Sequence, residues 1–276
     1  MPTHTLTLPS ATLAYEVEGD GQTALVFLHG AFVNRSYWRE QVTHFAPTHR
    51  VVAVDLAGHG GSVTHVKQRG PADFAREVFA VLDSLCCRDS SDSLKRVALV
   101  GHSFGADVAL ETAALLPPER VAAVVDVEHF KAVDAEPPAE LIAGLVAGLR
   151  ADFAGTAEAF ARQALLTPAT DAALVARLLA DYARTDPAVG IGVFEAIPGY
   201  GPRRRALLAS LPVPLHALHV DYSPTDEAAL DRATGGRYVL RVLVGTCHYP
   251  MAEGPVALNA DLEEVLAGAV TRTPPS

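Results

Sequence analysis

The segment between residues 97 and 116 places the strongest constraint on the fold of this 276-residue chain. A short apolar run, Val97–Val100, leads into Gly101–Gly105 (GHSFG), and the amphipathic stretch Phe104–Leu116 follows at once. This order predicts a strand that reverses sharply into a helix, with a glycine on each side where the backbones cross. Such a turn holds Ser103 in a strained conformation and projects its hydroxyl beyond the sheet, beside a helix N-terminus that favours negative charge.

Short apolar runs alternate with amphipathic stretches over much of the chain. Runs bounded by glycines and polar loops are typical of strands that are buried on both faces of a parallel sheet. The expected strands are Thr3–Leu8 and Thr12–Val17 as an opening hairpin, Ala24–Leu28, Arg50–Asp55, Val97–Val100, Val121–Val127, Leu215–Val220 and Arg237–Val244. The expected helices are Ser36–Phe45, Ala72–Leu85, Phe104–Leu116, Thr225–Thr234 and Val256–Ala269. This alternation predicts an α/β chain with a doubly wound, mostly parallel sheet.

The pattern changes between residues 132 and 210, where no stretch has the character of a strand. Four stretches, separated by prolines, have helical periodicity: Glu140–Leu149, Thr156–Leu166, Asp171–Arg184 and Gly190–Ala196. We therefore expect residues 1–131 and 211–276 to form one core domain, and residues 132–210 to form a helical cap inserted over one edge of its sheet. The end of the chain, Thr271–Ser276, is expected to be a frayed tail.

Composition narrows the class of partner. The chain is 49% hydrophobic and only 20% charged, which is enough apolar surface for a sizeable core. Its net charge of −10 argues against nucleic acid, because phosphate binding relies on clustered Lys and Arg. The single basic run, Arg203–Arg205, is interpreted as the solvated start of a helix. No apolar run reaches the length of a membrane span.

The cysteines and the first residues of the sequence indicate in which cellular compartment the protein is expected. Cys86, Cys87 and Cys247 are odd in number and have no framework spacing, so we expect neither a disulfide scaffold nor a metal site. The sequence has no CxxC or HExxH pattern. The segment from Met1 to His4 is not a basic region followed by an apolar stretch. A reduced cytoplasm is therefore the expected location.

A serine hydroxyl is a weak nucleophile and needs a base. Among 11 histidines, His248 is the best placed, because it follows the last expected strand and α/β sheets gather their sites at the carboxyl ends of strands. His29, His59 and His102 also lie at strand ends. We interpret His29 and His102 as structural or cavity-lining residues rather than as the base.

The base in turn needs an acid that holds its tautomer and stabilises the imidazolium. Asp221 follows the strand Leu215–Val220, and Glu128 follows the strand Val121–Val127. Asp226 is a third candidate, although Thr225 and Asp226 resemble the N-cap and first turn of a helix. Asp221 is favoured because Ser, Asp and His usually follow one another in that order along the chain.

Attack on a carbonyl creates an oxyanion, which needs two preorganised donors. One expected donor is the N–H of Phe104, directly after the nucleophile. The other is expected from the loop Leu28–Phe32, with Ala31 as the first choice and Phe32 as the second. Gly30 in that loop lets the backbone approach closely.

Together these motifs resemble the α/β-hydrolase superfamily, in its capped branch with a serine nucleophile. The matching stretches are Phe27–Phe32, Val52–Ser62 (VAVDLAGHGGS), Val100–Ala106 (VGHSFGA) and Gly245–Asn259 (GTCHYPMAEGPVALN). The resemblance implies that Ser103 is the nucleophile, His248 the base, and Ala31 and Phe104 the oxyanion donors. It also implies that Asp55 and Ser62 belong to a loop that supports the fold rather than to the triad.

Two departures from the family pattern concern the acid. The family's Gly-x-x-Asp acid pattern is replaced by Val220–Ser223, which weakens the assignment of Asp221. Glu128 matches the position where some relatives, dehalogenases among them, place the acid. Dehalogenases and epoxide hydrolases of the superfamily use an aspartate nucleophile, so Ser103 argues against both activities.

The expected function is hydrolysis of a small carboxylic ester through an acyl-enzyme, with no cofactor or metal. His29, Phe32 and His102 are expected to contact the substrate. Two alternatives stay open, because fold and triad do not separate them. The same triad can serve C–C bond hydrolysis, acyl transfer, perhydrolysis or lyase chemistry, and a non-catalytic member can use the cavity to bind a small molecule.

Overall fold

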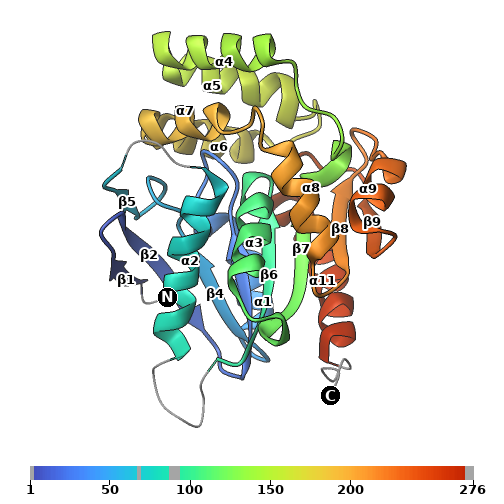
Figure 1. Ribbon diagram of the computed structural model, residues 1–276. Coiled ribbons are helices and arrows are strands. Elements are labelled where there is room, and N and C mark those ends of the chain that lie inside the picture. The colour runs from blue at the N-terminus through green and yellow to red at the C-terminus, as the bar shows by residue number, and fades with distance from the viewer. Residues whose placement is uncertain (1–2, 67–69, 87–93, 271–276) are drawn as a thin grey trace.

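A mixed, mostly parallel β-sheet forms the centre of the protein, as the computed structural model of residues 3–66, 70–86 and 94–270 shows (Figure 1). Its strands lie in the order β1-β2-β4-β3-β6-β7-β8-β9, and β5 pairs with β2. The strands are β1 (Thr3–Thr7), β2 (Ala11–Glu18), β3 (Thr23–Leu28), β4 (Arg50–Val54), β5 (Val63–Thr64), β6 (Arg96–His102), β7 (Val121–Val127), β8 (Leu215–Val220) and β9 (Tyr238–Leu243). The predicted α/β fold with a mostly parallel sheet is confirmed.

Strand pairing agrees with the predicted opening hairpin and mostly parallel sheet. β1 and β2 form the expected antiparallel hairpin, and β2 also runs antiparallel to β4. All pairs from β4 through β3, β6, β7 and β8 to β9 are parallel. The carboxyl ends of β6, β7, β8 and β9 therefore meet at one edge, which brings the loops after these strands together. The two-residue strand β5 was not predicted.

Helices cover both faces of the sheet. Successive strand residues point to opposite faces, so Val26 packs in one buried cluster and Phe27 in the other. In Figure 1, α2 and α3 lie on the near face, while α11 lies behind the strands. The helices outside residues 132–210 are α1 (Arg39–Phe45), α2 (Pro71–Cys86), α3 (Phe104–Leu115), α9 (Glu227–Thr234), α10 (Pro250–Glu253) and α11 (Pro255–Val270), with 3-10 turns Arg35–Trp38 and Pro118–Arg120.

The chain between β7 and β8 is helical, as the sequence predicts, and most of it lies above the carboxyl edge of the sheet (Figure 1). After a 3-10 turn at Phe130–Ala132 it forms α4 (Ala139–Ala151), α5 (Phe153–Phe160), a π-helical turn (Ala161–Leu165), α6 (Ala172–Arg184), α7 (Pro187–Glu195) and α8 (Gly201–Ser210). We refer to α4–α7, including the π-helical turn, as the cap helices. The division into a core and a cap domain stays a prediction.

The helix α8 contradicts one interpretation of the sequence. The run Arg203–Arg205 lies in its first turn, but α8 packs against α3 rather than facing solvent throughout. Arg204 is 16% exposed at its side chain and pairs with Asp107 of α3, and Arg203 pairs with Glu111 of the same helix. The prediction that this run faces solvent is therefore wrong for Arg204. Sequence periodicity does not reveal a buried carboxylate on another helix.

Some expectations fall outside the described residues. Cys86 and Cys247 have free thiols, whereas Cys87 and the tail Thr271–Ser276 lie outside the part of the chain that the structure describes. Within the described part, none of the helices combines the length and the apolar character that crossing a membrane requires.

Candidate active site

Ser103 sits at the tight turn between β6 and α3. Its backbone has φ 50° and ψ −127°, and its N–H donates to the carbonyl of Val127 at 2.9 Å. A Cβ on Gly101 would lie 2.2 Å from the carbonyl oxygen of Gly105, and a Cβ on Gly105 would lie 2.5 Å from that of Leu28. Only glycine fits at these two positions, so the GHSFG motif builds the strained turn that the sequence predicts.

Ser103 opens on a cavity of about 360 Å³ between the sheet edge and the cap helices. His248 lines the same cavity, as do Ala31 and Phe104. Its apolar wall includes Phe32, Phe160, Leu165, Val193, Phe194 and Ile197. Its polar wall includes Asp107, His129, Lys131 and Arg204. The structure thus gathers the predicted nucleophile, base and oxyanion loop around one space and encloses them with cap residues.

His248 lies in the loop after β9 and is fixed through its own backbone. Its N–H donates to the carbonyl of Leu165 at 3.0 Å, and its carbonyl accepts from Nε2 of His102 at 2.7 Å. The side chain is 9% exposed. The histidine is therefore held between the residue that precedes the nucleophile and the π-helical turn of the cap.

Glu128 is the carboxylate that the structure brings to His248. It follows β7 directly with φ 63°, and its side chain is fully buried. Oε2 lies 3.5 Å from Nδ1 of His248, and Oε1 accepts from the Val220 N–H and pairs with Lys131 Nζ at 2.9 Å. Burial by itself would raise the pKa of Glu128, but His248, the Val220 N–H and Lys131 outweigh it and hold this pKa below its usual value.

Asp221, which the chain order favoured as the acid, has a different position. It is exposed, its N–H donates to the Leu243 carbonyl, and its Oδ1 accepts from the Gly245 N–H at 2.9 Å. Asp226 accepts from the Ala229 N–H as the N-cap of α9, as its sequence context indicates. Neither carboxylate forms an ion pair with His248, whereas Glu128, the alternative acid, does.

Two further residues at this edge were missed by sequence reasoning. Lys131 Nζ pairs with Glu128 and donates to the Val220 carbonyl at 2.7 Å and to the carbonyl and hydroxyl of Ser223, each at 3.0 Å. The Tyr222 hydroxyl lies 3.3 Å from His248 Nδ1, and Lys131 Nζ lies 4.5 Å from the centre of the Tyr222 ring. The only sequence signal was that Lys131 lies three residues after a strand-end carboxylate.

The loop after β3 supplies the second part of the expected oxyanion hole. A Cβ on Gly30 would lie 2.8 Å from Nδ1 of His102 and 3.1 Å from Cβ of Ser103, so glycine lets this loop pack against the nucleophile. Within the described residues, the Ala31 and Phe104 N–H groups donate to no other protein group. An N–H in the first turn of a helix, such as that of Phe104, has no partner within the helix.

The three predicted substrate-binding residues have different environments. Phe32 lines the cavity with φ 65° and packs on Phe194 with ring centres 5.7 Å apart. His102 also lines it, and burial together with the nearby His248 lowers its pKa well below the ordinary value, so the ring is neutral. His29 does not line the cavity: Nδ1 donates to the Gly30 carbonyl and Nε2 accepts from the Leu56 N–H.

Buried groups behind the oxyanion loop support the fold. Burial lowers the pKa of His29 to about 4 and that of His59 to about 3, so both rings are neutral and structural. Asp55 accepts from the Arg35 and Gly61 N–H groups, and the Ser62 hydroxyl donates to the Asp55 carbonyl at 2.7 Å. This matches the supporting role that the resemblance implies for the loop. In the described part of the chain, no group of three His, Cys, Asp or Glu side chains could hold a metal ion.

Known proteins resemble this chain in sequence and in structure. A match to the Alpha/beta hydrolase family covers residues 25–261. The chain is 32% identical over 218 residues to a pimeloyl-acyl-carrier-protein methyl ester esterase of Pectobacterium atrosepticum, which covers 76% of this chain and 79% of that protein. It is 38% identical over 111 residues to an acetyltransferase component of the acetoin cleaving system of Pseudomonas putida, but this covers only 40% of the chain and 28% of that protein.

Among solved structures, a thermophilic esterase from Thermogutta terrifontis has the same fold, with a TM-score of 0.82. It is 18% identical, and the match covers 98% of this chain and 99% of that one. At this identity the likeness concerns the fold alone. The family match spans most of the sequence and includes Ser103 and His248, and we conclude that the chain belongs to the alpha/beta hydrolase family.

Proposed function

We propose that the protein is a serine esterase that hydrolyses small carboxylic esters, with Ser103 as nucleophile, His248 as base and Glu128 as acid. The observation that carries this proposal is the shared cavity of Ser103 and His248, with the buried Glu128 carboxylate 3.5 Å behind Nδ1 of His248. Acyl transfer to a serine requires a nucleophile, a base beside it and an acid that orients the base, and this arrangement supplies all three.

In the first half-reaction, Ser103 Oγ attacks the ester carbonyl carbon while Nε2 of His248 takes its proton. The carbonyl π electrons move to the oxygen, and the N–H groups of Ala31 and Phe104 stabilise the resulting oxyanion. When the oxyanion collapses, the bond to the alkoxy group breaks and His248 returns the proton to the departing alcohol. The acyl group then remains on Ser103.

In the second half-reaction, water takes the place of the alcohol. His248 removes a proton from the water, which attacks the acyl carbon, and the tetrahedral intermediate releases the carboxylic acid and the Ser103 hydroxyl. Glu128 stabilises the protonated imidazole in both halves. Because its pKa is held low, Glu128 stays ionised at neutral pH, with Oε2 3.5 Å from Nδ1 of His248.

The cavity supports a small substrate with an apolar part. Its volume of about 360 Å³ lies at the small end of ligand sites, and the cap helices supply aromatic and branched side chains on one wall. The Pectobacterium relative is named as an esterase of a methyl ester, which supports a simple alcohol as the leaving group. We therefore propose esters of short acyl chains with small alcohols as the substrate class.

The proposal is tested with p-nitrophenyl acetate and butyrate, comparing the wild type with Ser103→Ala. We expect kcat to fall at least about 10⁴-fold in the variant, because the attacking group is lost. Ser210→Ala is the matched control, since the Ser210 hydroxyl donates to Leu207 at the end of α8 and does not line the cavity. Acid-quenched wild type should carry one acyl group on Ser103, detected by mass spectrometry of its peptides.

Two results would contradict the esterase proposal. One is a wild type that releases no p-nitrophenol above the buffer rate, which would favour ligand binding or cleavage of another bond. The other is full activity of folded Ser103→Ala, which would move the nucleophile elsewhere.

A further inference from the structure

The polar wall of the cavity contains a buried charged cluster that the proposed reaction does not use. Asp107 of α3 accepts from Nε and Nη2 of Arg204 of α8, both at 2.7 Å. Nε2 of His129 lies 2.7 Å from Oδ2 of Asp107. Burial by itself would raise the pKa of Asp107, but His129 and Arg204 outweigh it and lower this pKa to about 2. An ionised carboxylate only accepts, so Nε2 of His129 carries the proton.

We propose that Arg204, held by Asp107, to which His129 also donates, binds a second oxygen acceptor on the substrate, a ketone or carboxylate oxygen on the acyl chain beyond the ester carbonyl. This inference rests on the proposed esterase function and adds a specificity subsite to it. The subsite lies one helical turn along α3 from the nucleophile, because Asp107 follows Ser103 by four residues. That turn corresponds to roughly 6 Å along the helix axis.

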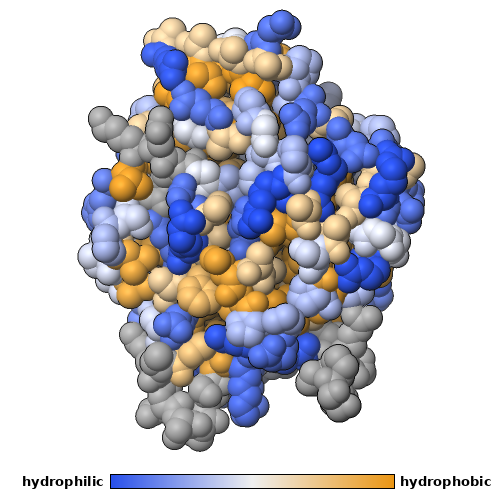
Figure 2. Space-filling model, viewed as in Figure 1, coloured by the Kyte–Doolittle hydropathy of each residue, from blue (hydrophilic) through white to orange (hydrophobic). Residues whose placement is uncertain are grey.

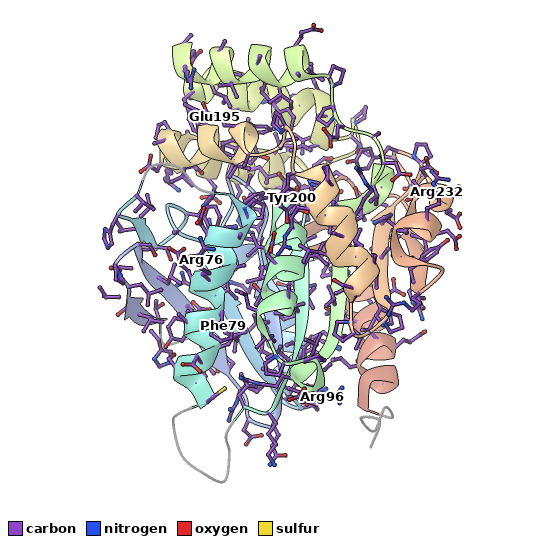
Figure 3. All side chains as sticks on the ribbon, in the orientation of Figure 1. Arg76, Phe79, Arg96, Glu195, Tyr200 and Arg232 are labelled. Carbon is purple, nitrogen blue, oxygen red and sulfur yellow. The ribbon has the colours of Figure 1, made fainter. Side chains whose placement is uncertain are left out.

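A second ion pair beside this cluster provides an internal comparison. Glu111, one turn further along α3, accepts from Nε and Nη2 of Arg203 at 3.1 and 2.9 Å. It also accepts from the hydroxyl of Tyr200, which Figure 3 shows at the upper end of α8 beside α3. Hydrophilic residues mark this crossing of α3 and α8 on the surface in Figure 2. Both pairs join the same two helices, but only Asp107–Arg204 lines the cavity.

The difference between the two pairs argues for a binding role. The Glu111–Arg203 pair already ties α8 to α3, and its arginine is 56% exposed. The Asp107–Arg204 pair is far more buried, at 3% and 16%, and burying a charge pair gains little stability over apolar side chains. An esterase for purely apolar acyl chains would gain nothing from charges in its cavity wall. A substrate oxygen that accepts from the guanidinium would explain their position.

The chemistry of the cluster selects an acceptor. Nε and Nη2 of Arg204 face Asp107, whereas Nη1 bonds to no group among the residues that the structure describes. Guanidinium N–H groups donate and never accept, and their planar geometry suits carbonyl and carboxylate oxygens. An unsubstituted alkyl chain that displaced water from the polar wall would instead leave these donors without a partner, which costs free energy.

The inference is tested with three methyl esters of similar length: methyl hexanoate, methyl 5-oxohexanoate and monomethyl glutarate. The last two carry a second oxygen on the fifth carbon, as a neutral ketone and as a carboxylate. We expect kcat/KM for methanol release to be at least about tenfold higher for one of them than for methyl hexanoate, as a good charge-assisted hydrogen bond allows. The ketone and the glutarate arms distinguish a neutral acceptor from an anionic one.

Variants locate the source of the preference. In Asp107→Leu/Arg204→Met, which removes both charges together, the ratio of kcat/KM values should fall below about threefold. The matched control Glu111→Leu/Arg203→Met removes the same kind of pair away from the cavity and should keep the wild-type ratio. Arg204→Lys keeps the charge without the planar fork and should also lower the ratio, which serves as the test if the first double variant does not fold.

Three outcomes would overturn this subsite. The first is a wild type that cleaves methyl hexanoate as well as both oxygenated esters. The second is a preference that persists in folded Asp107→Leu/Arg204→Met or in Arg204→Lys. Both leave the esterase proposal standing when methanol release depends on Ser103. The third, no Ser103-dependent release from any ester, overturns the esterase proposal and the subsite with it.

Discussion

The ends of β7 and β8 look alike in sequence and differ in structure. The two strands are parallel neighbours, with Val127 opposite Leu218, and each is followed within one residue by a carboxylate. Glu128 after β7 is 3% exposed and lies against His248. Asp221 after β8 is exposed and bonds to the Gly245 N–H.

Backbone conformation accounts for the difference. Both residues keep a backbone bond to the neighbouring strand, since Asp221 N–H donates to the Leu243 carbonyl and Glu128 N–H to the Leu218 carbonyl. Glu128 adopts φ 63°, which a residue with a side chain rarely takes, and this turns its side chain into the sheet edge. There its Oε1 accepts a hydrogen bond from the Val220 N–H, so the last residue of β8 helps to hold the Glu128 carboxylate in place. The left-handed backbone of Glu128, and not a loss of strand pairing, therefore separates the two carboxylates.

The largest expected effect comes from exchanging each carboxylate for its amide. Glu128→Gln should lower kcat about 10³- to 10⁴-fold, because the amide no longer stabilises the protonated His248 or enforces its tautomer. Asp221→Asn should keep kcat within about twofold, since the side chain is exposed and can still accept from Gly245. Steady-state kinetics with p-nitrophenyl butyrate on both folded variants measures the contrast.

The reverse result would restore the order of residues that the sequence favoured. If Asp221→Asn lost orders of magnitude in kcat while Glu128→Gln kept its activity, Asp221 would be the acid and the loop after β8 would have to rearrange during turnover.

The same comparison shows which parts of this site the sequence can predict. Ser103 and His248 could be found because their surroundings are local: a motif between strand and helix, and a loop after the last strand. The choice between the candidate acids Asp221 and Glu128 could not be made, because the φ of Glu128 and its contact with Val220 depend on how two distant segments pack. For the same reason the packing of α8 on α3, the Lys131–Val220 contact and the Arg204–Asp107 pair escaped prediction, since each brings together residues about 90 positions apart along the chain.

A second prediction concerns Lys131, which together with His248 and the Val220 N–H holds the pKa of Glu128 low. Lys131→Met should lower the free energy of unfolding at pH 7 by about 3 kcal/mol, because it leaves a buried carboxylate with less compensation. The pKa of Glu128 is held low in the folded protein, so its stabilising contribution is present above its unfolded pKa and is lost as pH falls through the folded value. In the variant this folded pKa rises, and Glu128 takes up a proton at a higher pH.

The difference between wild type and Lys131→Met should therefore shrink between pH 7 and pH 4, as measured by urea unfolding at both values. Arg232→Met is the control, because Arg232 is 61% exposed and its pair with Asp134 should contribute at most about 0.5 kcal/mol. An equal loss of stability at both pH values would mean that Lys131 acts through Val220 and Ser223 rather than through Glu128.

The smallest effect is expected at Tyr222, whose hydroxyl lies 3.3 Å from Nδ1 of His248, slightly closer than Glu128 Oε2 at 3.5 Å. Proximity alone would make Tyr222 the orienting group, but burial and the charge of Glu128 raise its pKa, so the phenol stays neutral and cannot balance an imidazolium. Tyr222→Phe should therefore lower kcat less than tenfold while the pH profile keeps its shape. A loss as large as that of Glu128→Gln would instead assign the orientation of His248 to the loop after β8, through its tyrosine rather than its aspartate.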